Sequence, residues 1–349
     1  MSPSPALSER ELQVLEAVIE EYVATAEPAG SQTLAKRYSL GVSSATIRST
    51  MSELETKGYL FHPHTSAGRI PTDLAYRLYV DHLLHNRRVA KVSAGARDTF
   101  AAELPASRTA VEELLARAAQ VLGVLTQELG VAVAPALEEV VLERLDLSQV
   151  ASDRLLLVFH LRSGAVRTIF VQARAHLAPG ATEQVARILN ERLAGHTLRE
   201  IRATLAERLR DAAHRDEHRE LLNIFLEEGD EIFSLSSPTG SAVVLGNATG
   251  LAEQPEFGSA PRMKELLTLT EKRDVLRDAL ETRRARGLSI TIGGEHGDPR
   301  LAGFTLVTSS YRAGDLAGVI GVLGPTRMPY DKIIGLVQHT SRLVEGLLE

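Results

Sequence analysis

Cysteine is absent from the 349-residue chain, which excludes disulfide bonds, cysteine-ligated zinc and thiol catalysis. Tryptophan is absent as well, and aromatic residues make up only 4% of the chain, too few for the stacking platforms that bind single-stranded nucleic acids. No apolar run reaches the ~18 residues of a membrane span, and the first residues, MSPSPALSERE, lack the apolar segment of a signal peptide. We therefore expect a cytoplasmic protein with no membrane partner.

The residues that are present are those of a globular protein with a local basic patch. The chain is 44% hydrophobic and 24% charged, and its length predicts two or three domains. Its net charge of −6 argues against nucleic-acid binding for the chain as a whole. Between Ser31 and Arg69, however, five basic residues against two acidic ones give a charge of +3, so positive charge is concentrated where phosphates could bind. The basic residues are Lys36, Arg37, Arg48, Lys57 and Arg69, and the acidic ones are Glu53 and Glu55.

Helical periodicity predicts three short helices in the first sixty residues. A capping box at Ser8 and Glu11 begins the first helix, which ends near Pro28. A second helix covers 31–38, and a third covers about 43–57. A helix, a short turn and a helix can form a DNA-binding helix-turn-helix, although an ordinary three-helix bundle has the same pattern.

The third helix has one apolar stripe and one polar face. Ile47, Met51 and Leu54 recur at helical spacing and predict the buried side. The opposite face holds Ser44, Ala45, Arg48, Ser49 and Ser52. Small hydroxyl residues with an arginine allow a helix to enter the major groove, where Arg pairs with guanine or phosphate.

A hairpin follows the third helix. Gly58 ends the helix, residues 59–61 are strand-like, and Ile70 begins a return strand. The polar segment between them, PHTSAGRIPTD, then becomes the wing of a winged helix, which contacts the backbone or the minor groove of DNA.

These elements give a predicted DNA-binding set. Ser44, Thr46, Arg48 and Ser49 are the candidates for base edges, with Ser43 at the start of the helix. The candidates for phosphate or minor-groove contacts are Lys36, Arg37, His64, Ser66 and Arg69.

The rest of the chain alternates helices and strands. A helix near 110–130 precedes three strand-like runs, a stretch of charged helices, three more strands and a last helix. We expect an α+β fold with a mostly antiparallel sheet and a helical insertion.

Residues 27–81, from EPAGSQTLAKRYSLGVSSATIR to PHTSAGRIPTDLAYRLYVD, closely resemble the N-terminal domain of the heat-inducible transcription repressor family HrcA. GNATGLAEQPEF, IGGE, LVTSSYR and GVIGVLGPTRMPYDKII resemble its C-terminal blocks. The chain departs from the family pattern at Ser44, where proline is usual, and at Ser49 and Thr50, where Asn-Asp is usual.

The resemblance implies three domains. They are a winged-helix DNA-binding domain at 1–88, a GAF-like domain at 105–178 plus 287–349, and an inserted dimerisation domain at 179–286. It also implies a homodimeric repressor that binds an inverted-repeat operator in double-stranded DNA upstream of heat-shock chaperone operons. By the same resemblance, the GroE chaperonin helps to keep the repressor active.

Other interpretations stay open beside this one. HRDEH at 214–218 matches a zinc-protease pattern, but dense surrounding charge favours a surface helix, so we expect no enzyme and no metal. IGGEHGD at 292–298 lacks the Lys-Ser/Thr of a phosphate-binding loop and is more typical of a turn between strands. The leucine stripes at 197–280 can be core or dimer interface. The alternative function is a winged-helix regulator whose GAF-like domain senses a small molecule, although no cofactor is expected.

Overall fold

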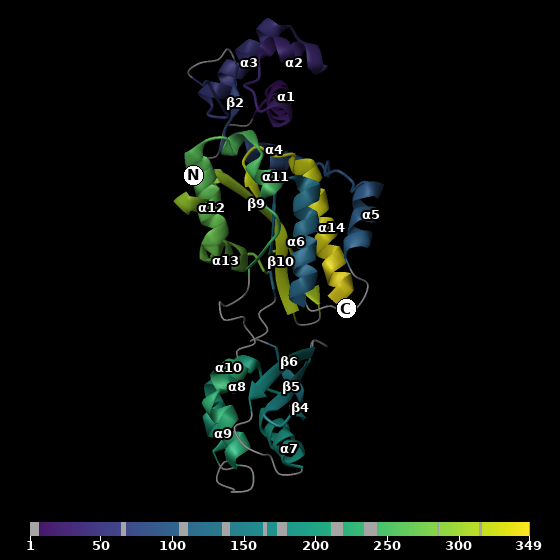
Figure 1. Cartoon of the computed structure of the whole chain (residues 1–349). Coiled ribbons are helices and arrows are strands. Elements are labelled where there is room, and N and C mark those ends of the chain that lie inside the picture. The colour runs from purple at the N-terminus through teal and green to yellow at the C-terminus, as the bar shows by residue number, and fades with distance from the viewer. Residues whose placement is uncertain are drawn as a thin grey trace. The chain divides into compact units, whose positions relative to one another are not determined.

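The computed structural model divides the chain into two compact units (Figure 1). The first unit comprises 1–132, 243–310 and 319–344, and the second comprises 133–242, 311–318 and 345–349. The residues that the structure describes are 7–63, 68–104, 111–134, 140–162, 166–172, 180–210, 219–233, 243–284, 286–313 and 316–348. In these ranges no helix has both the length and the apolar character needed to cross a membrane.

The first unit begins with a winged helix. Its elements are α1 (Glu9–Thr25), α2 (Ser31–Arg37), α3 (Ser44–Thr56), β1 (Leu60–Phe61), β2 (Ile70–Pro71) and α4 (Asp73–His85). The capping box predicted at Ser8 and Glu11 is confirmed, and Ser43, predicted at the start of the third helix, caps α3. The predicted hairpin is also confirmed, because β1 and β2 pair antiparallel with Phe61 opposite Ile70.

Backbone pairing joins the base of the wing to the turn between α1 and α2. Ala29 and Arg69 exchange two N–H···O bonds of 2.9 and 3.0 Å. Gly68 lies so close to this turn that an added Cβ would be 2.4 Å from the carbonyl oxygen of Pro28. The segment EPAGS therefore does more than end a helix, since Ala29 forms an isolated antiparallel bridge with the residue before β2.

The rest of the first unit holds most of a five-stranded sheet in the order β7-β3-β10-β9-β8, whose strands β9 and β10 extend into residues 311–318 of the second unit. The strands are β3 (Leu129–Val133), β7 (Val243–Leu245), β8 (Leu288–Ile292), β9 (Phe304–Ala313) and β10 (Leu316–Pro325). The helices are α5 (Ala94–Glu103), α6 (Val111–Thr126), α11 (Thr249–Ala252), α12 (Ala260–Glu271), α13 (Arg273–Glu281) and α14 (Tyr330–Leu348), with short 3₁₀ turns η2 (Pro255–Phe257), η3 (Gly293–His296) and η4 (Pro299–Leu301). In Figure 1, α12 and α13 lie on one side of these strands and α6 and α14 on the other. This is a GAF-like arrangement in which IGGEHGD connects β8 to β9, as predicted.

The second unit has its own three-stranded antiparallel sheet, in the order β4-β5-β6. Its elements are β4 (Leu142–Ala151), β5 (Arg154–Leu161), β6 (Val166–Gln172), α7 (Ala181–Leu193), α8 (Leu198–Leu209), α9 (Arg219–Glu227) and α10 (Gly229–Ile232). Alternate strand residues such as Leu155, Leu157 and Phe159 pack with helix residues such as Leu189 and Phe225 in one buried cluster. A capping box of Thr197 and Glu200 begins α8.

This division differs from the predicted domain ranges in two places. Residues 140–172 were expected in the GAF-like domain, but β4 to β6 belong to the second unit because their apolar face is covered by the helices that follow them. Residues 243–286 were expected in the insertion, but β7 pairs with β3, and α12 and α13 belong to the first unit. The expected single sheet is therefore two sheets, within the α+β class that was predicted.

Candidate nucleic-acid interface

The start of α3 is organised by hydroxyl groups. The Ser43 side chain accepts a hydrogen bond of 3.2 Å from the Thr46 backbone N–H, and the two hydroxyls lie 3.0 Å apart. Ser44 is the first residue of the helix. That position needs no intrahelical N–H donor, so either the proline usual in the family or the serine of this chain fits there. The hydroxyls of Ser43 and Thr46 thus hold the helix start in place.

The buried and exposed faces of α3 agree with the predicted periodicity. Ile47, Met51 and Leu54 are buried, and so is Thr50, whose hydroxyl donates to the backbone oxygen of Thr46 at 3.2 Å. Arg48 is exposed, and within the described part of the chain it forms no ion pair. The guanidinium of Arg48 is therefore available to an external acceptor.

Internal carboxylates neutralise three of the five basic residues of the N-terminal patch. Those pairs are Arg37 with Glu21 at 2.8 Å, Lys57 with Glu11 at 2.5 Å and Arg69 with Glu55 at 2.8 Å. Since Glu11 and Glu21 lie outside the 31–69 window, including them lowers its charge from +3 to +1. Lys36 is exposed like Arg48 and, in the ranges that the structure describes, also lacks a carboxylate partner.

Two of these pairs stabilise the winged helix. Arg37 on α2 and the Tyr38 hydroxyl both donate to Glu21 of α1, a carboxylate that is only 5% exposed. On α1, hydrogen bonds from the Lys57 ammonium and from the Ser8 backbone lower the pKa of Glu11 to about 2. Both carboxylates are largely shielded from solvent, and an ionised group in such a position needs a partner.

Arg69 attaches the wing to α3. Its Nε atom donates to Glu55 Oε2 at 2.8 Å, and its side chain is 19% exposed. Glu55 lies seven residues after Arg48, two helical turns along the same flank of α3. The two predicted wing contacts His64 and Ser66 lie outside the described residues.

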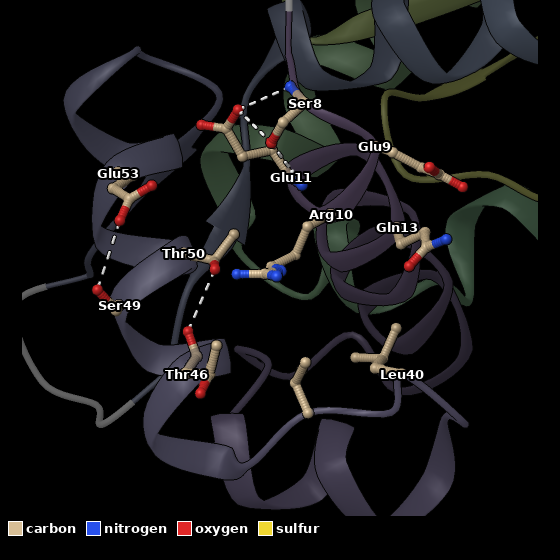
Figure 2. A pocket seen from close by; sticks show the side chains of 11 residues that line it. Ser8, Glu9, Arg10, Glu11, Gln13, Leu40, Thr46, Ser49, Thr50 and Glu53 are labelled. Carbon is tan, nitrogen blue, oxygen red and sulfur yellow. Dashed lines mark hydrogen bonds between the residues drawn. The ribbon is translucent and has the colours of Figure 1, made fainter.

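The other flank of α3 forms a groove with the start of α1 (Figure 2). Thr46, Ser49 and Glu53 line it from α3, and Arg10 and Gln13 line it from α1. Ser49 donates to Glu53 at 3.4 Å, and the side chain of Arg10 projects into the groove. Arg10 was not predicted from the sequence. The available signal was a cation in the first turn of a helix, where acidic residues are favoured.

Hydrogen bonds connect α4 to the 3₁₀ turn after β8. Arg77 donates to both carboxylate oxygens of Glu295, at 2.7 and 2.5 Å, and to the Ile290 carbonyl at 2.8 Å. Asp73 accepts the Gly294 backbone N–H at 3.0 Å. The IGGE block thus binds the winged helix.

A second link starts from the segment GPTRMPY. Arg327 binds the carboxylate of Glu256 and donates to the Val23 carbonyl of α1 at 2.8 Å. The rings of Tyr76 and Tyr330 pack nearby with centroids 5.8 Å apart. Sequence patterns did not predict these contacts, since the partners are far apart along the chain.

No cluster of three or more His, Cys, Asp or Glu suited to a metal occurs within the described ranges. The histidines of HRDEH, His214 and His218, lie outside those ranges.

A helix-turn-helix with paired strands, an exposed arginine on its last helix and an α+β body define a winged-helix transcriptional regulator. Residues 112–334 match the family model "HrcA protein C terminal domain". The chain is 37% identical over 341 residues to the heat-inducible transcription repressor HrcA of Chlorobium phaeobacteroides (strain BS1), covering 95% of this chain and 96% of that one. It is 34% identical over 346 residues to the repressor of the same name from Geobacter sulfurreducens, covering 98% of both. The chain belongs to the HrcA family of heat-inducible transcription repressors.

A solved structure supports the fold. A crystal structure of a hypothetical protein superposes with a TM-score of 0.69 at 22% identity, covering 98% of this chain and 99% of the other. At that identity the likeness concerns the fold alone.

Proposed function

We propose that this protein represses transcription by binding, as a homodimer, an inverted-repeat operator upstream of heat-shock chaperone operons. The main support for this proposal is the position of Arg48 on the exposed face of α3. Its guanidinium is exposed and has no carboxylate partner in the described chain. Arginine in a major groove binds the O6 and N7 atoms of guanine with two hydrogen bonds. Bound repressor blocks the promoter, so the mechanism has no chemical step and the protein is not an enzyme.

The proposed contacts fall into two groups. Ser44, Arg48 and Ser49 contact base edges, while Ser43 and Thr46 fix the helix start and offer their hydroxyls to the nearest phosphate or base. Lys36, Arg37, His64, Ser66 and Arg69 contact phosphates or the minor groove. In this group Lys36 acts as a free cation, whereas Arg37 and Arg69 act chiefly by holding α2 and the wing in position.

An inverted repeat requires a two-fold partner, and the open face of the β4-β5-β6 sheet suits one. One face of that sheet packs on α7 to α9. On the other face, Val166 and Phe170 of β6 lie beside the polar residues His160 and Arg154 of β5. Phe170 is 64% exposed and Val166 58%. Exposed apolar side chains grouped on one surface favour association. We propose that this face joins two copies of the chain in an isologous interface, which has the symmetry of the operator.

The proposed regulation follows the family resemblance. The GroE chaperonin helps the repressor to reach its active form in the cytoplasm, and heat occupies the chaperonin with unfolded proteins, so repression falls. Refolding of the denatured repressor with and without chaperonin and ATP, followed by operator binding, tests this part. Equal recovery of binding in both samples would remove the chaperonin from the proposal.

A footprint on DNA from upstream of the chaperone operons of the source genome tests the main proposal. We expect protection of two half-sites related by a two-fold axis, with contacts about one helical turn apart. Affinity should fall steeply with salt, because phosphate contacts release counterions. Uniform protection of unrelated DNA with the same affinity would contradict a specific operator.

A further inference from the structure

A pocket of about 370 Å³ lies between the end of α13 and the segment that runs from β8 to η4. Ligand pockets in proteins begin at about 300 Å³, so this volume is sufficient for a small metabolite. Charged side chains dominate its lining, among them Arg283, Arg286, Arg300 and Glu295. The pocket lies on the GAF-like sheet, away from the DNA-binding face of α3.

Arg283 is the unusual residue of this pocket. It is 6% exposed, and its guanidinium donates to the Ala279 carbonyl and, at 2.6 Å, to the Thr291 hydroxyl. Its Nε atom is buried without a hydrogen-bond partner, and no carboxylate in the described chain pairs with it. Burial, and then the nearby charge of Arg286, lower the pKa of Arg283. Buried guanidinium groups in proteins are nearly always paired, so this one lacks its counter-charge.

The carboxylates that line the pocket are already bound to other arginines. The pairs are Glu295 with Arg77 at 2.5 Å, Asp298 with Arg300 at 2.6 Å and Asp278 with Arg277 at 3.4 Å. Arg286 is exposed and, among the residues described, forms no ion pair. Arg283 and Arg286 are therefore the two cations of the lining that no side chain of the described chain neutralises.

His296 adds a second buried nitrogen without a partner. Its Nε2 atom forms no hydrogen bond within the described chain, while the ring forms one with the backbone of Phe304. Burial, and then the charge of Arg283, lower the pKa of His296 to about 4. The imidazole is thus in a positive environment that an anion would offset.

We propose that this pocket binds an oxyanion, the phosphoryl or carboxylate group of a small metabolite, with Arg283 as the main ligand and Arg286 at the entrance. The anion supplies the missing counter-charge of Arg283, and guanidinium groups bind both phosphate and carboxylate through paired hydrogen bonds. Glu295 lines the same pocket and holds Arg77 of α4, so the ligand binds beside the contact between the GAF-like sheet and the winged helix. This proposal does not depend on the proposed binding of an operator.

Calorimetric titration of the full-length protein with inorganic phosphate, and separately with acetate, in chloride buffer tests the site. We expect saturable binding of at least one anion, with a Kd of about 1 mM or below. The tighter anion identifies the class of the ligand. Arg286→Ala should weaken binding at least threefold, and Arg283→Met, which keeps the aliphatic stem and removes the charge, should abolish it.

Arg342→Ala is the matched control, because Arg342 is an exposed arginine of α14 that does not line the pocket. It should bind the anion like the unmodified protein. If Arg283→Met does not fold by circular dichroism, the exposed Arg286→Ala variant decides. The proposal is overturned if neither anion gives saturable heat up to tens of millimolar, or if Arg286→Ala binds as tightly as Arg342→Ala.

Discussion

The arginines of the winged helix differ in what their guanidinium groups contact. Arg37 and Arg69 each bind a carboxylate of the same domain, whereas Arg48 contacts none in the described residues. A paired guanidinium keeps part of its charge but has a fixed position, and an unpaired one can turn toward a base. Three arginines with the same charge are therefore expected to have different roles in DNA binding.

Arg48→Ala should weaken specific operator binding by about 1–3 kcal/mol, because it removes the proposed bidentate contact to a base. Fluorescence anisotropy with operator and scrambled duplexes measures the difference. Lys36→Ala is the comparison variant: it should weaken both duplexes alike and reduce the salt slope by about 1. Unchanged specificity in Arg48→Ala would remove this residue from the set that contacts bases.

Glu128 is a buried carboxyl group at the start of β3. Burial raises its pKa to about 8, an effect that a hydrogen bond from Gln254 only partly offsets, and its Oε2 atom lacks a partner among the described residues. A pKa that is raised on folding favours the protonated form. The contribution of Glu128 to the folding stability is therefore fully present below the ordinary pKa of 4.5 and is lost as the pH rises to about 8.

Glu128→Gln should therefore stabilise the protein increasingly between pH 5 and pH 9, by an amount on the order of 4 kcal/mol at the upper end. Thermal unfolding at several pH values measures this difference. Glu253→Gln, at an exposed carboxylate, should show no such trend. Parallel curves for the Glu128→Gln variant and the unmodified protein would contradict a raised pKa.

Among the elements, the wing depends on a close backbone contact. Gly68 has no side chain, and the wing base can therefore approach the turn at Pro28 and form the Ala29–Arg69 bridge. Any Cβ at this position would lie 2.6 Å from the Pro28 carbonyl carbon, a distance that requires the backbone to shift. The glycine of SAGR is explained by this contact.

Gly68→Ala should destabilise the winged helix by about 1–3 kcal/mol, as overpacking does in protein cores, and should weaken binding to all DNA sequences. Thermal unfolding and anisotropy measure the two effects. Gly95→Ala is the matched control: nothing lies within 4 Å of its added Cβ, and alanine favours the helix α5 by about 0.5–1 kcal/mol. Equal stability of the two variants would refute the close contact.

At the scale of the whole molecule, the two sheets have different surroundings. The five-stranded sheet binds the winged helix through Arg77 and Arg327, and the three-stranded sheet offers the apolar face around Phe170. A dimer formed through the second unit places two DNA-binding domains on one assembly. Such an arrangement converts two weak half-site contacts into one tight interaction.

Phe170→Asp should therefore dissociate the proposed dimer, with a loss of about 2 kcal/mol or more, since it replaces the most exposed large apolar side chain of this face with a polar charged one. Sedimentation equilibrium measures the change, and operator affinity should fall with it. Val124→Asp, at a residue 59% exposed on α6 of the first unit, should leave the dimer intact. Dissociation by both variants, or by neither, would count against this face as the interface.

Local features of the fold could be predicted from the sequence because their causes lie within a few residues. The capping boxes at Ser8 and Thr197, the buried stripe of α3 and the β1–β2 hairpin follow from nearby side chains. For the candidate site, the exposure of Arg48 followed from helical periodicity. The start of that helix at Ser43 followed from the same pattern.

Only the tertiary structure decided which partners meet across the chain. Arg77 and Glu295 are 218 residues apart, and Arg37 and Glu21 are 16 apart. Strand propensity for 140–172 was visible in the sequence, but which helices cover those strands was not, and so the predicted domain ranges differ from the compact units. Local patterns determine helices, turns and exposed faces, because backbone geometry has a short period. Ion pairing and the assignment of strands to sheets depend on contacts that form only when distant segments pack together.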